Sequence, residues 1–218
     1  MVSIRFIIDM DEDIRTAMYF TRSRMIAGGV NFTGNIIKEL PVLRSIIGKS
    51  ASARKNAIKK ALPEHYRSII DGLKSSKKRF EKVSSSFDSI KLERYMQSEV
   101  GVCRAYVSVF DCNPVYPDKK KFQIYYKASN EKALKTVVHE IIHILYNRHR
   151  LASINRLPKG KKWMLSEIVD ELVMEKFGLS QGGYPEHRKH FNAFKKLMKE
   201  SADFKSFLNQ AAESATGL

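Results

Sequence analysis

Apolar side chains recur at helical spacing along the first part of the chain. Between residues 49 and 82 they return every three or four positions, as on one face of an amphipathic α-helix. These residues are Ile58, Leu62, Tyr66, Ile69, Ile70 and Leu73. Pro63, within this stretch, marks the start of a helix or a break in one. We therefore expect residues 1–95 to form a helical N-terminal region.

The pattern changes near Gly101, where strands are expected. Two segments, RAYVSVF at 104–110 and KFQIYY at 122–127, are rich in the β-branched and aromatic residues that favour strands. The intervening segment DCNPVYPDKK contains Asp, Asn and Pro, which are typical of turns. The pattern predicts two strands that are antiparallel neighbours.

Three further helices are predicted after these strands. Ser129 and Asn130 offer an N-cap for a helix over 131–147. A second helix is expected over 163–177, ending at Gly178, and a last one over 186–208. The chain is thus predicted to be an α+β protein that is mostly helical, with a second domain over residues 96–218.

The helix expected over 131–147 carries two histidines on one face. His139 and His143, in the sequence HEIIH, are four residues apart, so their side chains lie one above the other. Two imidazoles so placed can bind one zinc ion. Glu140 points about 100° away, where it can act on a metal-bound water without replacing a ligand. A single helical histidine is more often a hydrogen-bonded core residue, but this spacing favours a metal site.

A catalytic zinc ion needs a third protein ligand and keeps one position for water. The sequence offers three candidates for that ligand: Glu167 in WMLSEIVDELV, His149 at the end of the metal helix, and His187 in YPEHRKHF. Asp170 and Glu171, one turn after Glu167, could orient a ligand histidine by hydrogen bonding.

The segments HEIIHIL and WMLSEIVDELV resemble the gluzincins, most closely the small intracellular ImmA/IrrE-like proteases. The resemblance covers residues 104–178. It implies a zincin-like metallopeptidase domain over 96–218, in which a small antiparallel sheet packs on the HExxH helix. The implied zinc ligands are His139, His143 and Glu167, with Glu140 as the general base. Ile168 departs from the Gly or Ala that is usual after the glutamate.

The segment YPEHRKHF has a weaker similarity to SprT-like proteases, whose third zinc ligand is a histidine. Arg188 stands where those proteases have glycine. Metallopeptidase sites often include an extra donor that stabilises the transition state. Tyr184, His187 and His190 are the candidates for that role here.

Charge adds a second functional hypothesis. The chain has a net charge of +16, and residues 49–82 carry a net charge of +8. Such a basic segment favours an anionic partner, with nucleic acid the first choice. The alternative function is therefore a basic nucleic-acid-binding protein with a structural or vestigial metal site. The leading hypothesis is a zinc metallopeptidase that acts on an intracellular protein or peptide.

Cysteine content and hydropathy indicate the cellular compartment in which the protein is expected. The chain has two cysteines, Cys103 and Cys112, which do not form a CxxC motif. Two cysteines are too few for a disulfide framework and are typical of a reducing compartment. No stretch approaches the roughly 20 apolar residues of a membrane span. We expect a cytoplasmic protein without a transmembrane segment.

Overall fold

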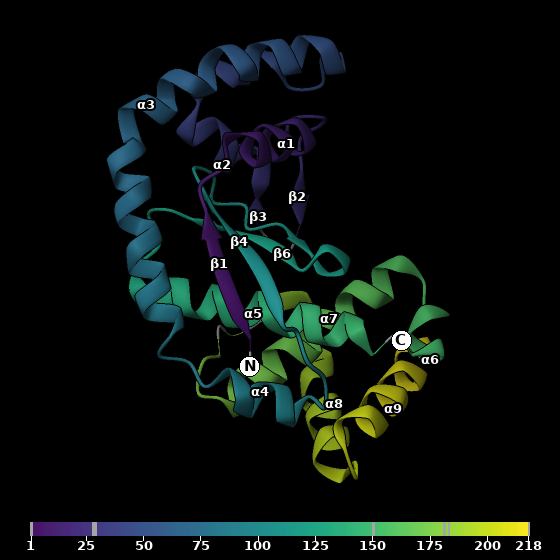
Figure 1. Ribbon diagram of the computed structural model, residues 1–218. Coiled ribbons are helices and arrows are strands. Elements are labelled where there is room, and N and C mark those ends of the chain that lie inside the picture. The colour runs from purple at the N-terminus through teal and green to yellow at the C-terminus, as the bar shows by residue number, and fades with distance from the viewer. Residues whose placement is uncertain (1, 28–29, 150, 181, 183, 218) are drawn as a thin grey trace.

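A mixed four-stranded sheet lies at the centre of the computed structural model (Figure 1). The structure describes residues 2–27, 30–149, 151–180, 182 and 184–217. The strand order is β1 (Ser3–Ile7), β4 (Val102–Ser108), β6 (Lys121–Tyr125) and β5 (Val115–Tyr116). β1, β4 and β6 run parallel, whereas β5 is antiparallel to β6. The predicted α+β class with a mostly helical chain is confirmed.

The predicted pairing of the two strands is wrong. β4 and β6 are present, but they run parallel, with Ala105 opposite Phe122. Parallel neighbours need a long connection rather than a hairpin turn. The turn residues between them instead form a hairpin of β5 and β6, closed by a short 3-10 turn over Pro117–Lys119 and by Lys120 in the left-handed region (φ 47°).

The N-terminal region is not wholly helical, because β1 pairs with β4 inside the sheet. The short strands β2 (Ile26–Ala27) and β3 (Val30–Asn31) form a second, two-stranded sheet. Four helical segments complete this region: α1 (Met10–Phe20), α2 (Phe32–Glu39), α3 (Ala51–Ser84) and α4 (Ser89–Tyr95), with a 3-10 turn over Pro41–Ile46. The helical structure expected over 49–82 is present as the single helix α3. The expected helix start or break at Pro63 is wrong, because α3 continues through that residue.

Helices cover the sheet on both sides. α1 lies over one face, where the Thr16 hydroxyl donates to Gln123 Oε1 of β6 at 2.9 Å. α5 (Asn130–Arg148) lies across the sheet from α1 and packs against β5 and β6 (Figure 1). α3 runs along the β1 side of the sheet and bends on its way from α1 to α5 (Figure 1). Prolines inside helices are a common cause of such bends.

The C-terminal helices pack beneath α5. α7 (Lys159–Lys176) contacts α5 directly, as expected for the helix predicted over 163–177. The single helix expected over 186–208 is instead two helices, α8 (Arg188–Glu200) and α9 (Phe204–Thr216). The break lies at Asp203, which is the N-cap of α9. Its carboxylate accepts a hydrogen bond from the Ser206 N–H at 2.7 Å. The short helix α6 (Ala152–Asn155) contacts α9.

One hydrophobic core joins the first 95 residues to the rest of the described chain. Phe6 of β1 and Phe80 of α3 pack together, with ring centroids 6.2 Å apart, and both belong to the same cluster as Val138 and Val169 of the metal-site helices. The predicted domain boundary at residue 95 therefore stays a prediction. Residues on both sides of it belong to the same hydrophobic core. Among the helices in the described residues, none is long and apolar enough to cross a membrane.

Candidate metal centre

The two histidines of α5 converge on one point. His139 Nε2 and His143 Nε2 are 3.1 Å apart, and the rings meet edge to face. A tetrahedral zinc ion with bonds of about 2.0–2.1 Å would hold two such nitrogens about 3.3 Å apart. Four-residue spacing on a regular helix thus suffices to pre-form half of a zinc site. His143 is buried, whereas the side chain of His139 is 24% exposed.

Glu167 brings a carboxylate from α7 to the side of His143. Its Oε1 lies 3.5 Å from His143 Nε2, a separation that also fits two ligands of one ion. The side chain is 10% exposed. The helix pair α5–α7 therefore brings together the three residues expected to bind zinc, on two helices that pack directly against each other.

Asp170 lies on the other side of the His139 ring. Its Oδ2 is 2.6 Å from His139 Nδ1, and this hydrogen bond directs Nε2 toward His143. One ligand atom from each of His139, His143 and Asp170 also fits within 4.8 Å, so these three residues form an alternative ligand set. An ion between two atoms 2.6 Å apart would need bonds at an acute angle. We therefore favour Glu167 as the ligand and Asp170 as the residue that orients His139.

Two hydrogen bonds of Glu171 reach the segment that follows α7. Its Oε1 accepts hydrogen bonds from the Ser180 hydroxyl and from Gly182 N, the latter at 2.9 Å. Glu171 thus holds the segment that follows α7, where Gly178 takes a positive φ of 71°. These two hydrogen bonds position Ser180 and Gly182, and the orientation of a ligand histidine by Glu171 stays a prediction.

Glu140 is a buried carboxyl group next to the histidine pair. Its Oε2 is buried and has no hydrogen-bond partner among the described residues. Burial raises the pKa of Glu140 to about 8; His139 opposes this rise, while Glu167 and Asp170 add to it. A carboxyl group whose pKa lies near neutrality is suited to accept a proton during catalysis.

The other groups of the centre also titrate abnormally. Burial lowers the pKa of His139, but Asp170, Glu140 and Glu167 outweigh it and raise the value to about 10. Burial and then His139 hold the pKa of His143 well below its usual range. Burial raises the pKa of Glu167 to about 7, against the effect of His139, and also raises that of Asp170. Two buried carboxyl groups, Glu140 and Asp170, and the largely buried Glu167 lie near two imidazoles, and a divalent cation would balance their charge.

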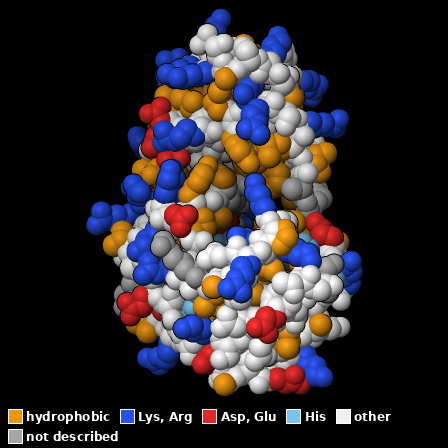
Figure 2. Space-filling view, turned by 90° about the vertical axis from the view of Figure 1, so that its right-hand side faces the viewer, with side chains coloured by type: hydrophobic (Ala, Val, Ile, Leu, Met, Phe, Trp, Pro, Cys, Tyr) orange, Lys and Arg blue, Asp and Glu red, His pale blue; other side chains and the backbone are white. Residues whose placement is uncertain are grey.

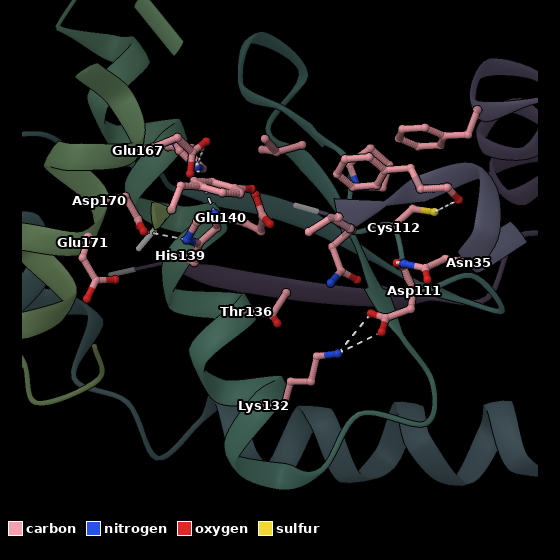
Figure 3. A pocket seen from close by; sticks show the side chains of 18 of the residues that line it. Asn35, Asp111, Cys112, Lys132, Thr136, His139, Glu140, Glu167, Asp170 and Glu171 are labelled. Atoms are coloured by element: carbon pink, nitrogen blue, oxygen red, sulfur yellow. Dashed lines mark hydrogen bonds and ion pairs between the residues drawn. The ribbon is translucent and has the colours of Figure 1, made fainter. Parts of the chain in front are cut away.

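The centre opens into a cavity of about 560 Å³. Figure 2 shows a hollow across the middle of the face that it draws. In Figure 3, the metal-site residues of α5 and α7 lie on one side, and Asn35, Asp111 and Cys112 lie on the other. Phe20, Val30 and Phe32 also line the cavity. The sequence did not indicate these lining residues, because they are far from HExxH along the chain and carry no catalytic motif.

The three candidate transition-state donors occupy different places. Tyr184 lines the cavity, and its pKa is raised by burial and by the nearby Glu167 and Glu140 carboxyl groups. His187 is buried, packs edge-on against Trp163 and lines a second cavity of about 410 Å³. His190 is half-buried in the first turn of α8 and lines neither cavity. The structure thus brings only Tyr184 of these three to the cavity of the metal centre.

The alternative third ligands lie away from the histidine pair. His149 Nε2 is 2.8 Å from the Met96 carbonyl oxygen, and its ring packs on Phe204. α5 continues as a regular helix through Arg148, so six residues turn His149 about 240° away from the direction of His143. His187 belongs to the cluster with Trp163. Among the described residues, the group of potential ligands around His139 consists of His139, His143 and Asp170, so it contains neither of these histidines and also omits Glu167.

Comparisons with known proteins found no relative. No protein-family model matches the chain, and neither curated proteins nor solved structures gave a significant match.

Proposed function

We propose that this protein is a zinc-dependent metallopeptidase of the gluzincin type, which hydrolyses peptide bonds in a protein or peptide substrate. The observation that carries the proposal is the 3.1 Å separation of His139 Nε2 and His143 Nε2, with Glu167 Oε1 3.5 Å from His143 Nε2 and Asp170 Oδ2 2.6 Å from His139 Nδ1. Buried Glu140 beside the pair and the adjoining cavity add the parts that hydrolysis needs.

Each residue has a role in this proposal. His139, His143 and Glu167 would hold the zinc ion, and Asp170 would fix the orientation of His139. Zinc in such a site supplies a Lewis acid that lowers the pKa of water and polarises a carbonyl group. Glu140 would take the proton of the attacking water and pass it to the leaving amine. Tyr184 could donate a hydrogen bond to the substrate oxygen as negative charge develops.

The sheet offers a place for the peptide. β6 lies between β4 and β5, so the outer edge on this side of the sheet belongs to β5. Val115 of β5 lines the same cavity as His139 and Glu140. An extended peptide that pairs with β5 would be held by main-chain hydrogen bonds beside the metal site.

Zinc analysis tests the metal site directly. The demetallated protein, reconstituted with zinc and freed of excess metal, should hold about one equivalent per chain by elemental analysis. His139→Ala should lower the bound zinc strongly, because it removes one of three ligands. His149→Gln, a change in a histidine that contacts Met96 instead, is the matched control and should bind zinc like wild type. Equal zinc content in wild type and His139→Ala would refute the site.

A second candidate function rests on the exposed face of α3. Seven basic side chains of this helix are exposed: Lys55, Lys59, Lys60, Arg67, Lys74, Lys78 and Lys82. Three exposed acidic residues, Glu64, Asp71 and Glu81, lie among them without balancing the charge. We infer that this face binds nucleic acid through phosphate contacts. It could act together with a catalytic zinc site or, in the alternative function, with a structural or vestigial one.

A further inference from the structure

The cavity beside the metal centre has an apolar wall built by the N-terminal region. Phe20 ends α1 and Phe32 begins α2, and their rings stack with centroids 5.0 Å apart and planes 18° from parallel. Val30 of β3 and Cys112, after β4, line the cavity with them. Phe20 is 7% exposed, so the wall is part of the packed protein and not a loose surface.

Hydrogen bonds fix this wall to the rest of the fold. Asn35 Nδ2 of α2 donates to the Asp111 carbonyl at 2.6 Å, which joins α2 to the segment between β4 and β5. The Thr33 hydroxyl donates to the Phe20 carbonyl at 2.7 Å and accepts the Met25 N–H at 2.8 Å. The wall is therefore held in one position relative to β5, along which the substrate is proposed to bind.

Helix α5 lines the cavity from the metal centre to the ion pair of Lys132 with Asp111. Lys132, Thr136 and His139 all line the cavity from α5. Lys132 pairs with Asp111 at 3.0 Å, next to Cys112. Seven residues of α-helix separate Lys132 from His139, which corresponds to about 10 Å along the axis. An extended peptide advances about 3.3 Å per residue. The part of α5 that lines the cavity thus matches about three residues of an extended substrate.

We propose that Phe20, Val30, Phe32 and Cys112 form a subsite that binds a bulky apolar side chain of the substrate, aromatic or branched aliphatic. This specificity proposal rests on the peptidase function proposed above. Burying such a side chain against the wall removes apolar surface from water, which is favourable. A charged side chain would lose its hydration there. The cavity volume of about 560 Å³ is typical of ligand-binding pockets.

Peptide selectivity provides the test. Zinc-loaded protein would be assayed with internally quenched peptides that carry Phe, Leu, Ala, Asp or Lys at one position within three residues of the cleaved bond. The Phe and Leu peptides should exceed the Ala peptide in kcat/KM by roughly 10- to 200-fold, the range that apolar pockets achieve. The Asp and Lys peptides should be the poorest substrates. Equal kcat/KM values for all five peptides would overturn the subsite and leave the peptidase function standing.

Two variants tie the selectivity to the wall. Phe32→Ala should remove most of the preference for Phe over Ala without changing the zinc content. Val30→Lys leaves both rings in place and adds a cation, so it should shift preference toward the Asp peptide; it also covers the case in which Phe32→Ala fails to fold. Val42→Ala truncates an apolar side chain that is 62% exposed, and it should keep the wild-type selectivity.

Binding separates failure of the subsite from failure of the proposed function. The affinity of labelled Phe and Ala peptides for wild type and Glu140→Gln can be measured by fluorescence anisotropy. If the wild type cleaves no peptide but binds the Phe peptide more tightly in a Phe32-dependent way, the subsite stands and the peptidase function fails. If neither cleavage nor selective binding is found, both proposals are overturned.

Discussion

Glu140 combines burial, a carboxyl oxygen without a hydrogen-bond partner among the described residues, and a place beside the imidazoles of His139 and His143. Glutamine has nearly the same shape but cannot accept a proton as a base. Glu140→Gln should therefore keep the fold and the zinc while peptide hydrolysis falls by roughly 10²- to 10⁴-fold, the usual loss when a general base is removed. Circular dichroism measures the fold, elemental analysis measures the zinc content, and kcat measures peptide hydrolysis. Undiminished kcat in a zinc-loaded variant would show that another group activates the water.

Glu167 and Asp170 should differ in how strongly they affect zinc affinity. Asp170 bonds to His139 Nδ1 at 2.6 Å, and loss of such an orienting partner costs about 10- to 100-fold in metal affinity. Glu167→Gln removes a proposed ligand and should cost more than Asp170→Asn. Competition with a chromophoric chelator measures both affinities. The reverse order would assign the third ligand to Asp170, in line with the alternative group of His139, His143 and Asp170.

Sequence spacing predicted the part of the candidate site that lies on α5. His139, Glu140 and His143 depend only on helix geometry, so their relative positions follow from the sequence alone. The opposite wall of the cavity could not be predicted in this way. Phe20 and Phe32 are more than a hundred residues from His139 along the chain, and their place depends on how α1 and α2 pack on each other and on the strands. Apolar residues at such positions look like any other core residues.

At the scale of elements, Asp13 links α1 to α3 and β4. This buried carboxyl group accepts hydrogen bonds from the Tyr66 hydroxyl at 2.5 Å, the Ser108 hydroxyl at 2.5 Å and Val109 N at 3.1 Å. Burial raises the pKa of Asp13 to about 6; these hydrogen bonds oppose the rise, and the charge of Asp9 adds to it. The carboxyl group is thus less acidic in the folded protein than in the unfolded chain, where its reference pKa is 3.8.

The raised pKa of Asp13 predicts the direction of a pH effect. Between about pH 4 and pH 6 the unfolded chain loses this proton first, so the free energy of unfolding should fall as pH rises. The fall from this group amounts to about 3 kcal/mol, since each pKa unit corresponds to about 1.4 kcal/mol. Urea unfolding at several pH values should show a smaller decrease for Asp13→Asn than for wild type. Asp71→Asn changes an exposed carboxylate of α3 and is the control. Identical pH profiles for wild type and Asp13→Asn would refute the prediction.

Helices were easier to predict than strand pairing. Periodicity and capping residues located α3, α5 and α7, because these signals lie within each element. The pairing of β1 with β4 joins segments about a hundred residues apart, and no local pattern specifies it. The turn residues between β4 and β6 were read as a hairpin of those two strands, whereas they close the hairpin of β5 and β6. The break between α8 and α9 at Asp203, the N-cap of α9, was not predicted.

For the molecule as a whole, α3 is the element that connects the two predicted regions. Its buried side, including Leu73 and Phe80, packs into the common core, while its outer side carries the exposed lysines and arginine. From Lys55 to Lys78, 23 helical residues correspond to about 35 Å along the bent axis of α3. A rigid row of cations on this scale can contact several phosphates without ordering a flexible segment, which favours nucleic acid as the partner.

Nucleic-acid binding through α3 should depend strongly on salt. Each phosphate that is neutralised releases counterions, so six or more contacts should lower affinity roughly 10³-fold or more between about 50 and 200 mM salt. The test variant carries glutamate at four exposed positions of α3: Lys55, Lys59, Lys74 and Lys78. The control makes the same change in charge at four exposed lysines near the C-terminal helices: Lys159, Lys189, Lys199 and Lys205. Mobility-shift titrations at low salt should show binding for wild type and for the control, and none for the α3 variant, whereas peptide hydrolysis should be the same in all three. Equal losses in the two variants would mean that affinity follows net charge and not this helix, and no complex at micromolar wild-type protein would mean that the lysines of α3 serve only as a hydrated surface.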